Sequence, residues 1–120
     1  MAMILLVDDE PDIRILTRMM LEKAGHSVVE AVNGDQGLKM LKNNRPDLIL
    51  LDVMMPGMKG WKVCEKIKAD KKNRDIPVVM FTIRSSEDSV KKSYECGADA
   101  HINKPFEIKE LLDTIERLLK

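Results

Sequence analysis

Residues 48–52 constrain the possible folds of this chain more than any other stretch. The first four, Leu-Ile-Leu-Leu, are all apolar, whereas a strand with one face in water would alternate apolar and polar residues. A short continuous apolar run predicts a strand buried on both faces, which is typical of a parallel sheet covered by helices. Asp52 ends the run, and Pro56 and Gly57 then turn the chain away.

Asp52 therefore lies where open parallel sheets bind their ligands, just beyond the carboxyl end of a strand. A carboxylate at this position either takes part in chemistry or only caps the turn that follows. This stretch alone leaves both interpretations open, so the decision depends on the residues that follow the other strands.

Four further apolar runs predict strands at residues 3–7, 27–31, 76–82 and 98–102, with stretches of helical spacing between them. Strands that alternate with helices predict a parallel sheet covered on both faces. Right-handed crossovers then favour an α/β, doubly wound (βα)5 sandwich. We expect one domain over residues 1–120, without an output domain. The strand order 2-1-3-4-5 is one common solution, although periodicity does not select it.

Local signals mark the expected helix boundaries. Pro11 fits the first turn of a helix, where its missing N–H costs nothing, and Gly25 supplies a stop. Ser85 with Asp88 resembles a capping box that opens the fourth helix. That helix carries few apolar residues, which is typical of an element that is weakly held and able to move.

The charge balance argues against some partners. The chain has 20 basic and 20 acidic side chains and a formal net charge of zero, whereas nucleic-acid binding relies on phosphate neutralisation. No apolar run is long enough to cross a bilayer, and no signal peptide opens the chain. We therefore expect a cytoplasmic protein without membrane insertion. Cys64 and Cys96 lack metal-ligand spacing and are expected to be free, partly buried thiols.

Polar residues follow four of the predicted strands: Asp8-Asp9, Asp52, Thr82 and Lys104. Parallel strands share one carboxyl edge, so these side chains should converge. Three converging carboxylates repel one another unless a cation is bound, and Mg²⁺ suits such hard oxygen ligands. One carboxylate could then attack phosphorus and form an aspartyl phosphate. Lys104 could neutralise the phosphoryl oxygens, and Thr82 could donate a hydrogen bond to them.

With their neighbours, these residues resemble the receiver domain of two-component response regulators, including those of the chemotaxis type. The similarity covers essentially the whole chain, in order and at family spacing. It implies a flavodoxin-like sheet of order 2-1-3-4-5. The matching elements are Val7-Asp8-Asp9-Glu10, Leu51-Asp52-Val53-Met54-Met55-Pro56-Gly57, Phe81-Thr82, Gly97-Ala98-Asp99 and Lys104-Pro105-Phe106.

The resemblance also implies roles for the residues at the strand ends. Asp52 would be the phosphoacceptor, and Asp9 would bind Mg²⁺ with Asp8 beside it. The backbone carbonyl of Met54 would be a further metal ligand. Such a domain is a phosphoacceptor protein rather than an enzyme, with only self-directed phosphotransfer and autodephosphorylation.

The implied partners act before and after this step. A sensor histidine kinase, a phosphotransfer protein or a small phosphodonor such as acetyl phosphate would supply the phosphoryl group. Thr82 and Lys104 would contact it, and the Lys104–Pro105 peptide would be cis. The surface of the fourth helix, fifth strand and fifth helix would then change and bind a target protein or a missing output domain.

Two residues depart from the family pattern. Ile83 stands where a small residue is usual, so it would either gate access to Asp52 or pack into the core. His101 stands where an aromatic switch residue is usual, so it would either take part in switching or be a half-exposed bystander. We expect no role for His26 and a solvated loop at residues 71–74.

Two other classes of protein fit the sequence less well than the receiver domain does. An aspartate-nucleophile phosphatase places a second acid two residues after the nucleophile, but Met54 occupies that position. A nucleotide-binding α/β module needs a glycine-rich turn after its first strand. Residues 7–11 contain no glycine and carry charges that repel phosphate.

Overall fold

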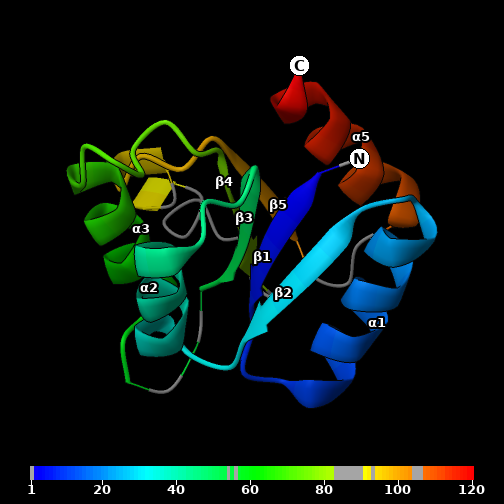
Figure 1. The fold of residues 1–120 in the computed structure, drawn as a ribbon, viewed down its shortest axis with the longest axis horizontal. Helices are drawn as coiled ribbons and strands as arrows, with labels where there is room; N and C mark the ends of the chain where they lie inside the picture. The colour runs from blue at the N-terminus through cyan, green and yellow to red at the C-terminus, as the bar shows by residue number, and fades with distance from the viewer. Residues whose placement is uncertain (1, 54, 56, 83–90, 93, 104–106) are drawn as a thin grey trace.

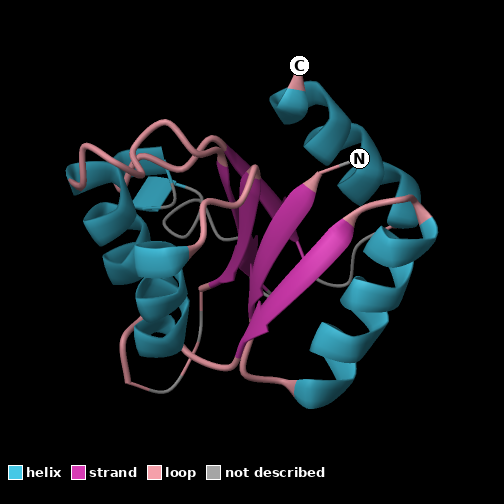
Figure 2. Cartoon of the chain, viewed as in Figure 1, coloured by secondary structure: helices cyan, strands magenta, loops and turns pink. Residues whose placement is uncertain are grey.

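The computed structural model describes residues 2–53, 55, 57–82, 91, 92, 94–103 and 107–120. Five parallel strands form one sheet in the order β2-β1-β3-β4-β5, which confirms the expected topology. Figure 2 shows this sheet enclosed between helices. The strands are β1 (Met3–Val7), β2 (Ser27–Ala31), β3 (Leu48–Asp52), β4 (Val78–Thr82) and β5 (Ala100–Asn103).

Helices cover both faces of the sheet. In Figure 1, α1 and α5 lie on one side of the strands, and α2 and α3 lie on the other. Residues 91–92 and 94–95 are also helical, while the expected start of the fourth helix at Ser85 lies outside the described residues. The labelled helices are α1 (Pro11–Lys23), α2 (Gly34–Asn43), α3 (Gly60–Ala69) and α5 (Ile108–Leu119).

The central strand β3 is buried along its whole length. Leu48 and Leu50 belong to the core shared with α1 and α5, whereas Ile49 and Leu51 belong to the core shared with α2 and α3. Alternate side chains of a strand point to opposite faces of the sheet. The continuous apolar run is therefore explained by two separate cores.

The last two strands begin later than expected. Ile76 donates its backbone N–H to the carbonyl of Asn73 in the preceding turn, and Pro77 has no N–H to offer, so β4 begins at Val78. Asp99 lies just before β5, where its Oδ2 accepts hydrogen bonds from Val78 N at 2.8 Å and from Lys68 Nζ at 2.9 Å.

The buried face of α1 differs from the one that hydrophobicity predicts. Leu16 is 49% exposed and Met19 is 62% exposed, whereas Thr17 is fully buried. The Thr17 hydroxyl donates to the carbonyl of Ile13 at 2.7 Å, which removes most of the cost of burying it. An apolar patch made of Ile15, Leu16 and Met19 consequently stays in contact with solvent.

Within the described part of the chain, none of the helices has both the length and the apolar character needed to cross a bilayer.

Candidate functional site

An acidic cluster lies at the carboxyl edge of the sheet, where β1 and β3 are neighbours. Four side chains, those of Asp8, Asp9, Glu10 and Asp52, each offer a carboxylate oxygen within 4.8 Å of the others. Asp8 is fully buried and Asp52 is 3% exposed. The register pairs Val7 with Leu51, so Asp8, which directly follows β1, and Asp52, the last residue of β3, lie at the same level of this edge.

Glu10 joins this cluster although it was not expected as a site residue. The sequence signals are its place directly after Asp9 and its presence in the matching element Val7-Asp8-Asp9-Glu10. The turn into α1 brings it back toward the carboxylates, with Glu10 N donating to Asp8 Oδ1 at 2.9 Å.

The side chain of Asp9 brings a buried oxygen to this cluster. Asp9 Oδ1 is buried and accepts no hydrogen bond from the described residues. A buried carboxylate oxygen without a donor is costly, whereas it is well placed to coordinate a cation. The donor set consists of carboxylates, which hard divalent cations prefer. The cluster therefore fits a magnesium-type ion.

The chain beyond Asp52 is held close to the neighbouring elements. Val53 N donates to the carbonyl of Phe81 on β4 at 2.9 Å, and Gly60 N donates to the carbonyl of Val53 at 2.9 Å. Lys59 Nζ reaches the carbonyl of Met55 at 3.2 Å. Gly60, the first residue of α3, is thus hydrogen-bonded to the residue that directly follows Asp52.

The remaining expected site residues are only partly placed. The register pairs Asp52 with Phe81, so the backbone of Thr82, the last residue of β4, lies one position further along the same edge. Lys104 directly follows Asn103, the last residue of β5, but Met54, Ile83 and Lys104 lie outside the described residues.

His101 lies in β5 opposite Met80. Its side chain is partly exposed, and its Nε2 is buried without a hydrogen-bond partner among the described residues. Burial disfavours the charged imidazolium and lowers the pKa of His101 below its ordinary value of 6.5.

The position of His101 predicts a pH dependence of stability. Because its pKa is lower in the folded protein, the unfolded chain binds more protons, so stability falls as the pH drops from about 6.5 through the lowered pKa. We expect His101→Phe to lose less free energy of unfolding than the unchanged protein between about pH 7.5 and pH 5.5. Urea unfolding at both pH values measures this, and equal losses would assign the dependence to other groups.

The two cysteines are free thiols, as expected, although both are buried. Cys64 Sγ donates to the carbonyl of Cys96 at 3.4 Å. The hydrogen bond with Cys96 and burial raise the pKa of Cys64. A thiol held protonated in this way is a poor nucleophile.

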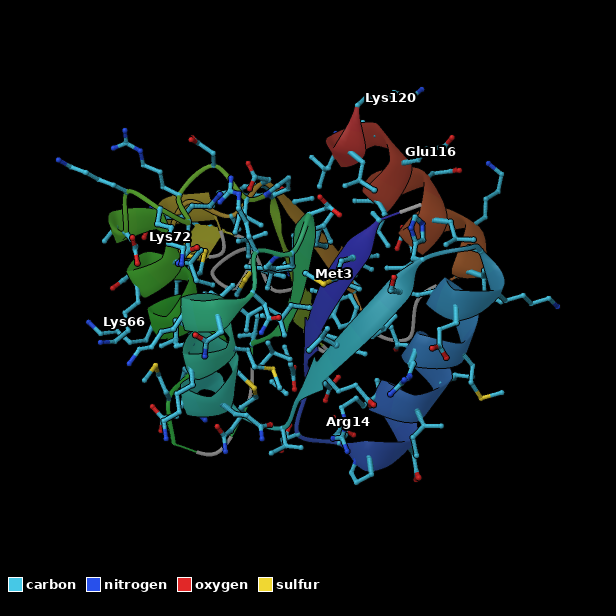
Figure 3. The ribbon with its side chains drawn as sticks, viewed as in Figure 1. Met3, Arg14, Lys66, Lys72, Glu116 and Lys120 are labelled. Carbon is cyan, nitrogen blue, oxygen red and sulfur yellow. The ribbon has the colours of Figure 1, made fainter. Side chains whose placement is uncertain are left out.

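The loop at residues 70–75 is more than a solvated connection. Asn73 is 5% exposed, Lys72 Nζ donates to the carbonyl of Lys42 at the end of α2, and Lys68 Nζ donates to the carbonyl of Arg74. Lys42, Lys72 and Asn73 also line a groove of about 410 Å³ between α2 and α3, together with Lys66. Figure 3 labels Lys66 and Lys72. The loop therefore has a structural role.

His26 also makes a structural contact, since its Nδ1 accepts from Ala2 N at 3.2 Å. The imidazole attaches the beginning of the chain to the loop between α1 and β2.

Comparison with known proteins identifies the family. A family described as "Response regulator receiver domain" matches residues 4–116. The transcriptional regulator RpaA of Synechocystis is 38% identical over 120 residues, covering 100% of this chain and 50% of that protein. The regulator PhoB of Pseudomonas aeruginosa is 40% identical over 117 residues, covering 98% of this chain and 51% of that protein. The chain thus spans about half the length of these curated relatives.

Solved structures agree with this similarity. The chemotaxis protein CheY4 of Vibrio cholerae has a TM-score of 0.94 and 32% identity, with 99% of each chain covered. The signal receiver domain of a histidine kinase from Syntrophus aciditrophicus has a TM-score of 0.93 and 38% identity, covering 99% of this chain and 90% of that one. With the parallel sheet of order 2-1-3-4-5 and the acidic cluster at its carboxyl edge, these matches show that the chain belongs to the response regulator receiver domain family, the phosphoacceptor signalling domains of two-component systems.

Proposed function

We propose that Asp52 accepts a phosphoryl group in a Mg²⁺-dependent reaction. The observation that carries this proposal is the position of Asp52, which is 3% exposed at the end of the central strand and has three further carboxylates within 4.8 Å of its own. Burial and clustering favour binding of a divalent cation, and the strand end leaves a carboxylate facing the edge where ligands approach.

The residues of the chain have distinct roles in this reaction. Asp8, Asp9, Asp52 and the backbone carbonyl of Met54 would hold Mg²⁺, which when bound supplies positive charge for the phosphoryl oxygens. An oxygen of Asp52 attacks phosphorus in line with the leaving group. A new O–P bond forms while the bond from phosphorus to the donor breaks, and the electron pair leaves with the donor.

Thr82 and Lys104 are proposed to contact the transferred group. Thr82 is the last residue of β4, and Lys104 follows Asn103, the last residue of β5, in the sequence. A hydroxyl donor and an ammonium at this edge would stabilise the charge of the group. Ile83 follows Thr82 and stays a predicted gate for the donor and for hydrolytic water. Autodephosphorylation, the only other chemistry proposed, uses the same in-line path.

Phosphorylation is proposed to act as a two-state switch. Contacts of the phosphoryl group with Thr82 would favour one arrangement of the surface made by the fourth helix, β5 and α5, with His101 in β5 as a responding side chain. Conversion of a 1:99 population to 99:1 needs about 5.5 kcal/mol. A few charge-assisted hydrogen bonds in a partly dry site can supply that energy.

The partners are proposed from the family and from the exposed surface. A sensor histidine kinase or phosphotransfer protein would donate the phosphoryl group in the cytoplasm, and a target protein or an output domain would bind the switched surface. The apolar patch of Ile15, Leu16 and Met19 on α1 is exposed and would offer such a partner a docking surface.

The experiment that tests the proposed function is phosphorylation by acetyl phosphate, followed by intact-mass measurement. We expect the mass of one phosphoryl group to be added when Mg²⁺ is present and none to be added when EDTA replaces it. Uptake that is independent of the cation, or turnover of a chromogenic phosphate ester, would contradict a receiver-type reaction.

Removal of Asp9 should separate cation binding from folding. Because Asp9 Oδ1 is buried without a partner in the described structure and lies among other carboxylates, Asp9→Ala relieves repulsion when no cation is present. We expect the free energy of unfolding without Mg²⁺ to stay level or rise, while Mg²⁺ affinity falls about 10-fold or more. Calorimetric titration and urea unfolding measure the two effects.

Asp12→Ala is the matched control, since it removes an exposed acid from the first turn of α1 that is not a member of the cluster. It should leave Mg²⁺ affinity nearly unchanged. A large loss of stability in Asp9→Ala without the cation would instead assign Asp9 a structural capping role.

A further inference from the structure

We infer that Arg14 is a positioning residue that orients the Asp8–Asp9 segment for cation binding. Arg14 Nη1 donates to the backbone carbonyl of Asp8 at 3.0 Å, and Arg14 Nε donates to Glu30 Oε1 at 3.1 Å. Its side chain is 16% exposed. Figure 3 shows Arg14 on the first turns of α1, near the C-terminal end of β2.

Glu30 fixes the direction of the Arg14 guanidinium. It lies in β2 opposite Leu6 of β1, and its second carboxylate oxygen accepts a hydrogen bond from Arg18 Nη1. The Glu30 side chain is 24% exposed. A carboxylate held by two arginines has little freedom to rotate, so the long Arg14 side chain is ordered before any cation arrives.

The Arg14 contact adds to two other hydrogen bonds that hold Asp8. Asp8 N donates to the carbonyl of Ala31 at 3.1 Å, and Asp8 Oδ1 accepts from Glu10 N at 2.9 Å. The carbonyl of Asp8 and the N–H of Asp9 belong to one planar peptide unit. A hydrogen bond that holds this carbonyl therefore also sets the direction in which the chain continues to Asp9, whose Oδ1 is buried without a partner in the described structure.

Charge and orientation predict opposite effects when Arg14 is removed. A positive guanidinium near four carboxylates repels a divalent cation, so by Coulomb's law alone Arg14→Ala would tighten Mg²⁺ binding. If Arg14 orients the Asp8–Asp9 segment, the same change weakens Mg²⁺ binding. Groups that orient metal ligands typically contribute about 10–100-fold to metal affinity, and we expect a loss of about 10-fold, in the lower part of that range.

The affinity for the larger cation Ca²⁺ provides a second measurement. General destabilisation of the protein would not change the ratio of the Mg²⁺ and Ca²⁺ affinities. Mg²⁺ demands near-ideal octahedral geometry, whereas Ca²⁺ accepts irregular ligand arrangements. A loosened Asp8–Asp9 segment should thus lose more affinity for Mg²⁺ than for Ca²⁺. A purely structural role for Arg14 would lower both affinities in parallel, together with the stability of the protein without cation.

This inference rests on the proposed function, and it is tested by calorimetric titration of the whole chain with Mg²⁺ and with Ca²⁺. Arg14→Ala should bind Mg²⁺ about 10-fold more weakly with a smaller loss for Ca²⁺. Arg14→Lys keeps the charge but replaces the planar fork by a single ammonium, so it should remain weaker than the unchanged protein. Arg18→Ala removes one of the two arginines that hold Glu30 but leaves the bond from Arg14 to the carbonyl of Asp8 in place, so it should give a smaller loss of Mg²⁺ affinity than Arg14→Ala.

Glu30→Gln provides a second variant should Arg14→Ala fold poorly. It preserves the shape of the side chain and weakens the anchor of Arg14, so it should give a smaller loss in the same direction. Unchanged or tighter Mg²⁺ binding in the Arg14 variants, or parallel losses for both cations, would overturn the inference. Absence of Mg²⁺ binding by the unchanged protein would overturn the proposed function and the inference with it.

Discussion

Replacement of Asp52 by asparagine should abolish phosphate uptake from acetyl phosphate. The amide keeps the shape of the side chain at this 3% exposed position, but it lacks the anionic oxygen that attacks phosphorus. It also removes one negative charge from the cluster. The free energy of unfolding without Mg²⁺ should therefore stay level or rise, so loss of uptake is not explained by loss of the fold.

The residue just before β3, Asp47, supplies the control for this experiment. Asp47 lies just before β3, at the opposite edge of the sheet, where its Oδ2 accepts a hydrogen bond from Met3 N at 2.8 Å. Asp47→Asn should take up phosphate at the rate of the unchanged protein. If Asp52→Asn gained the same mass as the unchanged protein, the phosphoacceptor would be another residue.

A methyl group at Gly60 should damage both the fold and the phosphorylation site. An added Cβ would lie 2.3 Å from the backbone oxygen of Asp52 and 2.8 Å from the Cα of Val53. Backbone atoms cannot move aside as a side chain can. Gly60→Ala should therefore lower the free energy of unfolding by about 1–3 kcal/mol, as overpacked cores do, even though alanine favours helix formation by up to about 1 kcal/mol.

The same clash should slow phosphorylation, because the backbone that moves belongs to Asp52 itself. Small displacements of a reacting group can reduce rates about 100-fold. We expect a reduction of about 10-fold or more in the rate of mass gain under conditions where the variant is folded. Urea unfolding and time-resolved intact-mass measurement test the two effects separately.

Gly34→Ala is the matched control for Gly60→Ala. Gly34 is the first residue of α2, as Gly60 is of α3, and its added Cβ would lie 2.5 Å from Val63 Cγ2. This contact is with a side chain and not with the backbone of Asp52. We expect some loss of stability with a nearly normal phosphorylation rate. Equal slowing of phosphorylation in both variants would contradict a specific effect of Gly60 on the Asp52 backbone.

The sequence was sufficient to predict the class of fold, because the decisive signals are local. Residues 3–7 and 27–31 form strands with the expected bounds, and β3 ends at Asp52 as expected. Continuous apolar runs indicate strands buried on both faces, and helices of matching number imply a parallel sheet. A parallel sheet brings its carboxyl ends to one edge, so convergence of Asp8, Asp9 and Asp52 followed from the pattern.

Tertiary contacts decided what local patterns leave open. The exposure of Leu16 and the burial of Thr17 depend on how α1 is rotated against the sheet, which the many apolar residues of that helix do not specify. The late starts of β4 and β5 depend on the turn at Ile76 and on the side chain of Asp99. Hydrogen bonds between segments distant in sequence carry no periodic signal.

The five-unit α/β class and the carboxylates that meet at the sheet edge therefore follow from the spacing of apolar and acidic residues along the chain. The way in which these carboxylates are held depends on tertiary contacts. The close approach of Gly60 to the Asp52 backbone and the bond from Arg14 to the carbonyl of Asp8 depend on where α3 and α1 lie against the sheet. Helix placement is set by packing across the whole domain, so no single stretch of the chain encodes it.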